Sequence, residues 1–264
     1  MDLRLVGKVA WVTGGGGGIG SAIAAGLAAE GADVAITGRT LSTLEDTATT
    51  IAAASGRRVI AVPADVTDSE AVVEAAATVV RELGGIDILV NSAATPGGKT
   101  GTSFETVTDQ QVLRDLDEKL VSTLRACQAA VPYMKERGWG RLIHVGGLGG
   151  RRSGSYSSIR TLALVHLSKT LSDELGPYGI TSNVVHPGAT HGRWLAESLA
   201  SRSAVGGASE AELEGELASV SAIRRLLDPE EIAHVVTFLA SPLSTAVTGE
   251  SIGTGGGMDR AVTI

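Results

Sequence analysis

Short apolar runs rich in β-branched residues alternate along the chain with longer segments rich in alanine and leucine. The short runs predict strands and cover residues 8–13, 33–37, 58–66, 86–94, 141–147, 180–188 and 250–253. The longer segments have helical spacing and cover residues 21–31, 42–55, 69–84, 109–137, 156–176 and 230–240, with Ser69 as the expected cap of the third. Strands that are apolar throughout and are joined by helices predict an α/β fold, in which a doubly wound parallel sheet has helices on both faces. Because no linker divides residues 1–264, we expect a single domain.

Residues 189–228 depart from this alternation. The segment is rich in serine, glycine, glutamate and alanine, contains Trp194, and lies near the expected ends of the strands. An insertion in that place is typical of a lid or substrate loop over a pocket.

Composition narrows the classes of function. The 264 residues are 43% hydrophobic and 19% charged, which is enough apolar material for a core and too little charge for a disordered chain. The net charge of -7, without a basic stripe, argues against nucleic acid as a partner. The single cysteine, Cys127, excludes an internal disulfide and a cysteine-based zinc site. Since no signal peptide or membrane-spanning run is recognisable, we expect a cytoplasmic protein with no membrane partner.

A glycine-rich loop follows the first expected strand. The strand runs directly into Thr13-Gly-Gly-Gly-Gly-Gly-Ile-Gly20, and a helix comes next. Gly14 allows the tight turn, Gly18 lets the backbone approach a pyrophosphate, and Gly20 lets the helix pack closely on the strand. The phosphates would lie at the positive N-terminus of the helix. This context favours a dinucleotide site of the Rossmann type over a merely flexible turn.

The end of the second strand bears on which dinucleotide binds. Enzymes that use NAD hold the ribose 2′-hydroxyl with an acidic side chain near this point. Here residues 37–40 contain no acid. Arg39 could pair with a 2′-phosphate in a bidentate geometry, or it could be a solvated surface residue. We favour NADP(H) as the cofactor, with NAD(H) as the alternative.

The loop motif resembles that of the short-chain dehydrogenase/reductase superfamily, and the resemblance covers almost the whole chain. It implies a cofactor site made of Gly14, Gly18, Ile19, Gly20, Asp65, Val66, Asn91, Ala93, Pro187 and Gly188, with Asp65 beside the adenine and Asn183, Pro187 and Gly188 beside the nicotinamide. Residues 228–241 and 248–252 resemble the family's C-terminal signature, although residues 255–257 are Gly-Gly-Gly where Asp-Gly-Gly is usual. The resemblance also implies a small-molecule substrate and a homo-oligomer, either a tetramer or a dimer.

The family's catalytic residues are mostly replaced. The resemblance implies a serine that holds the substrate oxygen and an asparagine that supports a water relay, but these positions hold Gly147 and Lys119. Ser153 and Ser155 follow close behind Gly147.

Two alignments of the family's Tyr-x-x-x-Lys motif are open. In one, Tyr156 and Arg160 form a Tyr-x-x-x-Arg pair on one helix face, and the arginine stabilises tyrosinate but passes no proton on. In the other, which needs no gap, Ser157 and Thr161 take the two positions. Tyr156 is then rotated by about 100° unless a one-residue bulge restores it. Without the bulge it would be an interface or pocket-wall residue.

The five histidines add one further candidate. His144, His166 and His234 lie in apolar runs and are expected to be structural, and His186 precedes Pro187. His191 begins the variable segment and could act as an acid or base, although a solitary loop histidine is more often solvated.

Three functions fit these observations. The first is an NADP(H)-dependent oxidoreductase that interconverts a carbonyl and an alcohol on a small molecule, with Tyr156 as proton donor and Arg160 as its partner. The second is a cofactor-binding pseudo-enzyme with a regulatory or assembly role. The third is a non-redox enzyme, because Tyr-x-x-x-Arg resembles the halohydrin dehalogenase branch. That branch gives up the dinucleotide loop and keeps the serine, unlike this chain.

Overall fold

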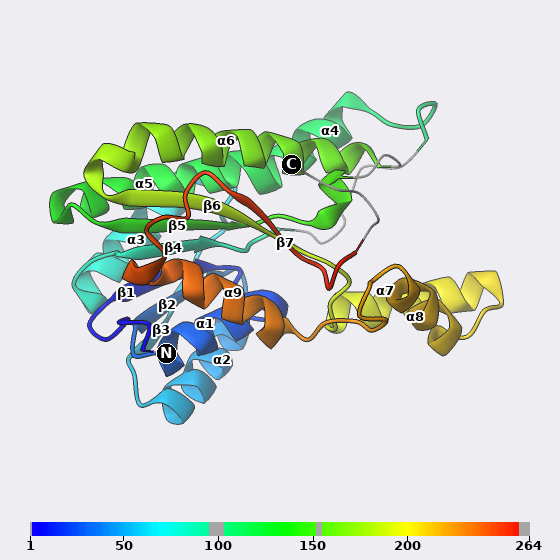
Figure 1. The fold of residues 1–264 in the computed structure, drawn as a ribbon, viewed down its shortest axis with the longest axis horizontal. Helices are drawn as coiled ribbons and strands as arrows, with labels where there is room; N and C mark the ends of the chain where they lie inside the picture. Colours follow the sequence, from blue (N-terminus) through cyan, green and yellow to red (C-terminus); the bar gives the residue numbers. More distant parts are fainter. Residues whose placement is uncertain (1, 95–102, 152–154, 259–264) are drawn as a thin grey trace.

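The computed structural model describes residues 2–94, 103–151 and 155–258, which contain a seven-stranded parallel sheet (Figure 1). The strands are β1 (Val9–Thr13), β2 (Asp33–Gly38), β3 (Val59–Pro63), β4 (Ile88–Asn91), β5 (Gly140–Val145), β6 (Ile180–Pro187) and β7 (Ser251–Thr254). Their order is β3-β2-β1-β4-β5-β6-β7. The chain therefore winds outward from β1 in one direction and from β4 in the other. This confirms the expected doubly wound fold, and it creates a crevice where the strand order reverses.

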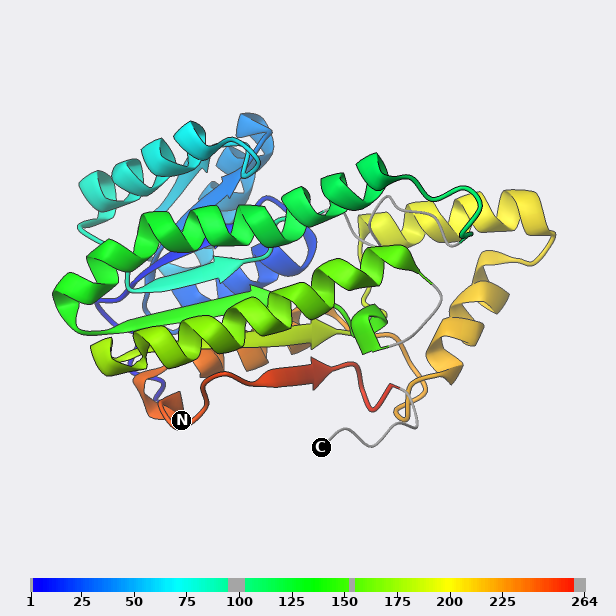
Figure 2. The same cartoon turned by 90° about the horizontal axis from the view of Figure 1, so that it is seen from above.

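Helices cover both faces of the sheet (Figures 1 and 2). One face carries α1 (Gly18–Ala29), α2 (Leu41–Ser55) and α9 (Pro229–Ala240), and the other carries α3 (Ser69–Leu83), α5 (Ser122–Arg137) and α6 (Ile159–Leu175). Alternate strand residues serve the two cores, so Val12 and Val90 pack on the α1 side while Trp11 and Leu89 pack on the α3 side. Burial on both faces explains why the strands are apolar throughout. No described helix is long and apolar enough to span a bilayer.

The helix starts refine the sequence prediction. Asp68 rather than Ser69 caps α3, because its Oδ1 accepts hydrogen bonds from the backbone N of Glu70 (2.9 Å) and Ala71 (3.2 Å). The prediction of Ser69 as the cap was wrong by one residue. An ionised aspartate there also suits the positive end of the helix.

The long helix expected over 109–137 is interrupted. It consists of α4 (Asp109–Leu116), a π-helical turn η1 (Asp117–Val121) and α5. A π turn inserts one residue per turn and changes which side chains face the neighbouring elements, and such turns are frequent at functional sites.

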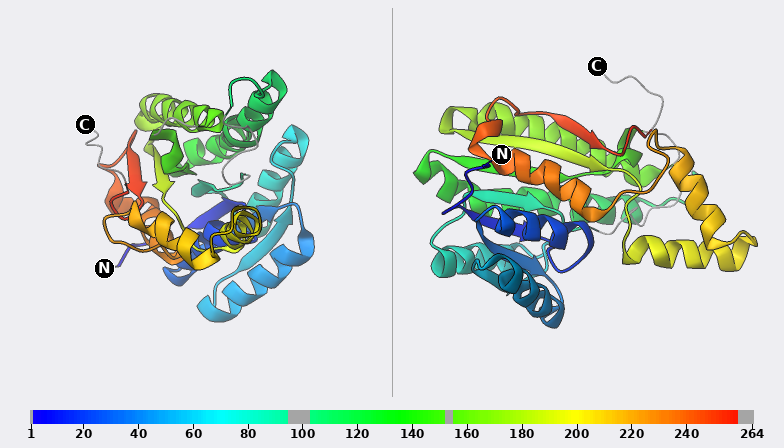
Figure 3. Two further views of the ribbon diagram at one scale, coloured as in Figure 1. Left: turned by 90° about the vertical axis from the view of Figure 1, so that its right-hand side faces the viewer. Right: turned by 60° about the horizontal axis from the view of Figure 1, so that its bottom comes forward.

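The insertion at 189–228 folds into two helices, α7 (Arg193–Gly206) and α8 (Glu210–Ser219). They project beyond the carboxyl ends of the strands, away from the main body (Figures 1 and 3). Leu195, Leu199 and Leu213 join Leu226 in a small apolar cluster separate from the two main cores. A pair of helices with an apolar cluster of its own, at this edge of the sheet, suits the expected role as a lid over a pocket. That role stays a prediction.

Candidate functional site

The glycine loop after β1 is constrained by close backbone contacts. Gly14 has a φ of +70°, and a Cβ there would lie 2.8 Å from the Cα of Ala93. A Cβ on Gly20 would overlap the carbonyl oxygen of Gly14, so the start of α1 packs on the loop itself. Gly18 has a φ of +54°, and an added Cβ would meet nothing within 4 Å. The loop therefore leaves free space at the N-terminus of α1, where backbone N–H groups favour an anion.

A cavity of about 520 Å³ opens beside this loop. Of the residues expected to bind the cofactor, it is lined by Gly14, Arg39, Asp65, Val66 and Ala93. These residues follow the ends of four neighbouring strands. The cavity thus lies at the switch point between β1 and β4, where ligands bind in folds of this type.

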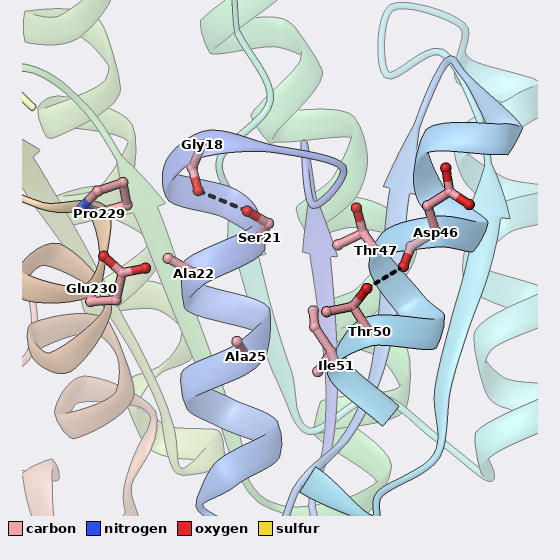
Figure 4. Close-up of a pocket in the computed structure, with 10 residues that line it drawn as sticks. All are labelled: Gly18, Ser21, Ala22, Ala25, Asp46, Thr47, Thr50, Ile51, Pro229 and Glu230. Carbon is pink, nitrogen blue, oxygen red and sulfur yellow. Dashed lines mark hydrogen bonds between the residues drawn. The ribbon is translucent and has the colours of Figure 1, made fainter. Parts of the chain in front are cut away.

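Gly18 is not among the residues that line this cavity and instead borders a second hollow on the outer side of α1 (Figure 4). Its hydroxyl groups are bound to their own helices, as Ser21 Oγ donates to the carbonyl oxygen of Gly18 (2.9 Å) and Thr50 Oγ1 donates to that of Asp46 (2.8 Å). Asp46 and Glu230 contribute carboxylates to its lining. Two carboxylates make this hollow unsuitable for a phosphate.

The end of β2 has a cationic rather than an acidic side chain. Thr37 is buried, and its Oγ1 accepts a hydrogen bond from Trp11 Nε1 at 2.8 Å. Arg39 follows and lines the cavity together with Asp65. Hydrogen bonds from the backbone N (2.9 Å) and Oγ1 (2.7 Å) of Thr67 hold the pKa of Asp65 below its ordinary value, and the charge of Arg39 adds to this. These residues fit a dinucleotide with a 2′-phosphate, which would pair with Arg39.

Asn91 ends β4 and is buried below the cavity. Its Nδ2 lies 3.1 Å from His144 Nδ1 on β5, and His144 Nε2 lies 3.2 Å from Ser182 Oγ on β6. Because the amide nitrogen can only donate, the imidazole proton is on Nε2. Burial lowers the pKa of His144 to about 3, and the charge of Lys119 contributes. His144 is therefore neutral and holds three strands together, the structural role expected of it.

The ends of β5 and β6 meet beside Gly147. Its backbone N donates to His186 Nδ1 at 3.2 Å. An added Cβ on Gly147 would meet nothing within 4 Å, so packing does not require glycine at this position, where the family resemblance predicts a serine. Pro187 ends β6, and the backbone N of Gly188 donates to the carbonyl oxygen of Thr254 on β7 at 3.2 Å. Both residues therefore lie at the same edge of the sheet as the loop.

The chain enters α6 through a 3₁₀ turn and not through the one-residue bulge that would restore the position of Tyr156. Tyr156–Ser158 form a 3₁₀ turn, η3, directly before the helix. Ser157 is buried, and its Oγ donates to Asp115 Oδ2 on α4 at 2.7 Å. Tyr156 is only half-buried. Ser153 lies outside the described residues. The side chain that enters the interior from this turn is thus Ser157.

Three buried ionisable groups gather in this corner between η1 and α6. Asp115, Lys119 and Arg160 are 2%, 4% and 8% exposed, and Arg160 Nη1 lies 4.0 Å from Asp115 Oδ1. Burial lowers the pKa of Arg160, while Asp115 and Glu118 act in the opposite direction. Burial also lowers the pKa of Lys119 to about 7, and the charge of Arg160 contributes. Lys119 was recognised only by its aligned position, and no sequence signal marked Asp115.

The insertion adds a residue that the sequence did not single out. Arg193, at the start of α7, lines the same cavity as Arg39, and its Nε donates to Glu197 Oε1 at 2.7 Å. His191 is exposed, and its backbone N donates to the carbonyl oxygen of Leu227 at 2.8 Å. Within the described part of the chain its ring makes no hydrogen bond or ion pair, so nothing there prepares it as an acid or base.

Comparison with known proteins identifies the family. A family model described as enoyl-(acyl carrier protein) reductase matches residues 15–259. Short-chain reductase protein NovJ of Streptomyces niveus is 38% identical over 256 residues, which cover 95% of this chain and 93% of that protein. Cyclohexanol dehydrogenase of Rhodococcus sp. (strain TK6) is 35% identical over 278 residues, covering 97% and 98%. L-Sorbose reductase from Gluconobacter frateurii, in a crystal structure with NADPH and L-sorbose, has a TM-score of 0.93 at 29% identity and covers 99% of this chain and 100% of that one. The chain therefore belongs to the short-chain dehydrogenase/reductase superfamily and is an NAD(P)-dependent oxidoreductase.

Proposed function

We propose that this protein is an NADP(H)-dependent oxidoreductase that interconverts a carbonyl group and an alcohol on a small molecule. The observation that carries the proposal is the cavity at the switch point, which joins the glycine loop to Arg39. One continuous space thus offers a helix N-terminus to a pyrophosphate and a guanidinium to a 2′-phosphate. The relatives named above are a reductase and a dehydrogenase, and L-sorbose reductase is seen with NADPH.

The chain's residues would bind and orient this cofactor, which when bound supplies a hydride to a carbonyl carbon or accepts one from an alcohol. Gly14, Gly18, Ile19 and Gly20 shape the pyrophosphate end. Asp65 and Val66 border the adenine, Asn91 and Ala93 form the floor at the end of β4, and Pro187 and Gly188 border the nicotinamide. Helices α7 and α8 would close over the bound substrate and exclude water.

For the proton transfer we propose Tyr156 and Arg160. The Tyr156 hydroxyl gives its proton to the substrate oxygen, and the Arg160 guanidinium four residues later stabilises the tyrosinate that remains. Arg160 keeps its own proton. The tyrosinate must therefore recover a proton from another group.

We also propose that the protein is a cytoplasmic homo-oligomer. Leu113 on α4 is 62% exposed, and Ile159 and Leu162 on α6 are 47% and 59% exposed, which supports association of copies through these helices. The free, buried Cys127 suits a reducing compartment.

A cofactor-binding pseudo-enzyme is the second candidate. Gly147 favours it, because this position has room for a side chain and yet offers no hydroxyl to a substrate.

Binding and turnover separate the two candidates. Reduced-nicotinamide fluorescence should show NADPH binding about tenfold or more tightly than NADH, because only NADPH has the 2′-phosphate. Mixing the NADPH complex with a panel of ketoses and cyclic ketones should then oxidise the cofactor. Binding without oxidation across the panel would favour the pseudo-enzyme, and failure to bind either nucleotide would overturn both candidates.

Two variants test the proton donor. Tyr156→Phe should lower kcat by about 100-fold or more, the usual size of a general-acid contribution, while the Kd for NADPH stays within about twofold. Ser157→Ala should keep a measurable kcat. The reverse pattern would assign the proton transfer to the buried Ser157 instead.

A further inference from the structure

Arg193 is the second cation of the cofactor cavity. Among the described residues that line this cavity, only Arg39 and Arg193 are positively charged, while Asp65 and Glu118 are negative. These four charges cancel, yet the proposed ligand has two anionic groups, the pyrophosphate and the 2′-phosphate. Because Arg39 is proposed to pair with the 2′-phosphate, Arg193 is the remaining cation of this lining that could pair with the pyrophosphate.

Arg193 comes from the insertion and not from the sheet. It is the first residue of α7, which begins beyond the carboxyl ends of the strands (Figure 3). It lines the cavity together with Gly14, Gly16 and Gly17 of the glycine loop. Arg193 and the glycine loop thus border one space, and the N-terminus of α1 favours an anion there.

The place of Arg193 in its own helix does not explain why a cation is present. The N-terminus of a helix carries a positive partial charge, so a cation in the first turn is unfavourable. The first turn of α7 has no acidic residue, and the N-cap residue Gly192 offers no side chain to the free N–H groups. Arg193 therefore weakens the start of the helix, and an anion bound beside it would offset the repulsion.

Arg193 forms an exposed ion pair on its own helix. Its Nε donates to Glu197 Oε1 at 2.7 Å, and the two side chains are 92% and 61% exposed. Exposed pairs contribute little to stability, and a cation four residues before a glutamate is the less favourable order on a helix. A phosphate group offers a guanidinium two parallel charge-assisted hydrogen bonds. Exchange of Glu197 for a phosphate is therefore favoured.

We infer that Arg193 binds the pyrophosphate of the dinucleotide, in competition with Glu197 for the same guanidinium; this rests on the proposed function. The two arginines then divide the cofactor between them. Arg39 recognises the 2′-phosphate, which only NADP(H) has, whereas Arg193 recognises the pyrophosphate, which NADP(H) and NAD(H) share. Arg193 thus contributes affinity without selecting between the dinucleotides, and it joins α7 to the bound cofactor.

Titration of the full-length protein with NADPH and NADH tests this assignment. Arg193→Ala should weaken binding of both dinucleotides by about tenfold, because each loses one charge-assisted contact. Its Tm should stay unchanged, since the side chain is exposed and alanine suits a helix. Arg193→Lys should recover much of the affinity, because an ammonium also pairs with a phosphate. The control Arg202→Ala removes a cation elsewhere on α7, 3.9 Å from Glu216, and should leave both Kd values within about twofold.

Two smaller ligands separate the phosphates. ADP-ribose contains the pyrophosphate, and adenosine 2′-monophosphate contains only the 2′-phosphate. Competition against NADPH should show that Arg193→Ala weakens ADP-ribose by about tenfold and leaves adenosine 2′-monophosphate within about twofold. Glu197→Gln should act in the opposite direction and tighten ADP-ribose by about twofold, because it removes the competing charge.

The outcomes separate the inference from the function on which it rests. If the wild type binds NADPH and Arg193→Ala binds both dinucleotides equally well, the inference is wrong and the proposed function stands. A loss confined to NADPH and adenosine 2′-monophosphate would assign Arg193 to the 2′-phosphate and would also overturn the inference. If the wild type binds neither dinucleotide, the proposed function is wrong, and the role of Arg193 is overturned with it.

Discussion

The glycine loop after β1 and the corner between η1 and α6 serve one candidate site but are built from different materials. The loop is almost entirely backbone, and Gly14 and Gly20 are required by contacts that a Cβ would violate. The corner is made of ionisable side chains, since Asp115, Lys119 and Arg160 are each less than a tenth exposed. The loop depends on glycines that have no side chain, and the corner depends on buried ionisable side chains.

This difference determines which amino-acid substitutions the loop and the corner tolerate. A steric constraint on the backbone is all or nothing, because packed backbone atoms cannot move aside. Buried charges can be exchanged for others during evolution, but each exchange shifts the pKa values of its neighbours. On this reasoning a chain can keep its glycine loop while the side chains of the charged corner change.

Breaking the loop should have the largest effect. Gly20→Val would place side-chain atoms on the carbonyl oxygen of Gly14 and displace the glycine loop, which we propose binds the pyrophosphate. We expect the affinity for NADPH to fall by about 1,000-fold or more, or about 4 kcal/mol, with a lower Tm. Gly215→Val on α8, where an added Cβ meets nothing within 4 Å, is the matched control. An unchanged Kd in Gly20→Val would show that this loop is not the cofactor cradle.

Breaking the charged corner should have a somewhat smaller effect in free energy. The effect should be on the stability of the fold rather than on the affinity for the cofactor. Asp115→Ala removes a carboxylate beside Arg160 and the acceptor of the Ser157 hydroxyl. We expect the free energy of unfolding, measured by urea denaturation, to fall by about 3 kcal/mol. Asp173→Ala removes the exposed partner of Lys169 and should change nothing measurable. Equal losses in the two variants would mean that water enters the corner and screens its charges.

Weakening the cationic end of the cavity should have the smallest effect of the three and should sharpen the choice of cofactor. Arg39→Ala should weaken NADPH binding by about tenfold, because one charge-assisted contact is lost. Binding of NADH should stay within about twofold, since it has no 2′-phosphate. Arg81→Ala, on the exposed side of α3, is the control for a general change in charge. Parallel losses for both dinucleotides would contradict the proposed role of Arg39.

The sequence by itself determined the sheet, the order of its elements and the glycine-rich loop after β1. These features depend on local patterns, since strands buried on both faces are apolar throughout and a tight turn with positive φ favours glycine. The errors at this level were small. Asp68 replaces Ser69 as the cap of α3, and α1 begins at Gly18 rather than at residue 21.

Only the tertiary structure decided the composition of the charged corner. Asp115 and Ser157 are 42 residues apart and meet through their side chains. Aspartate and lysine in a helical pattern usually face solvent, so their burial cannot be recognised from residue type. The π turn at Asp117–Val121 and the 3₁₀ turn at Tyr156–Ser158 change the direction of side chains. The spacing of apolar residues along the sequence does not reveal either turn. The pKa of Lys119 depends on what other elements pack around it, and desolvation of that kind exists only once the chain has folded.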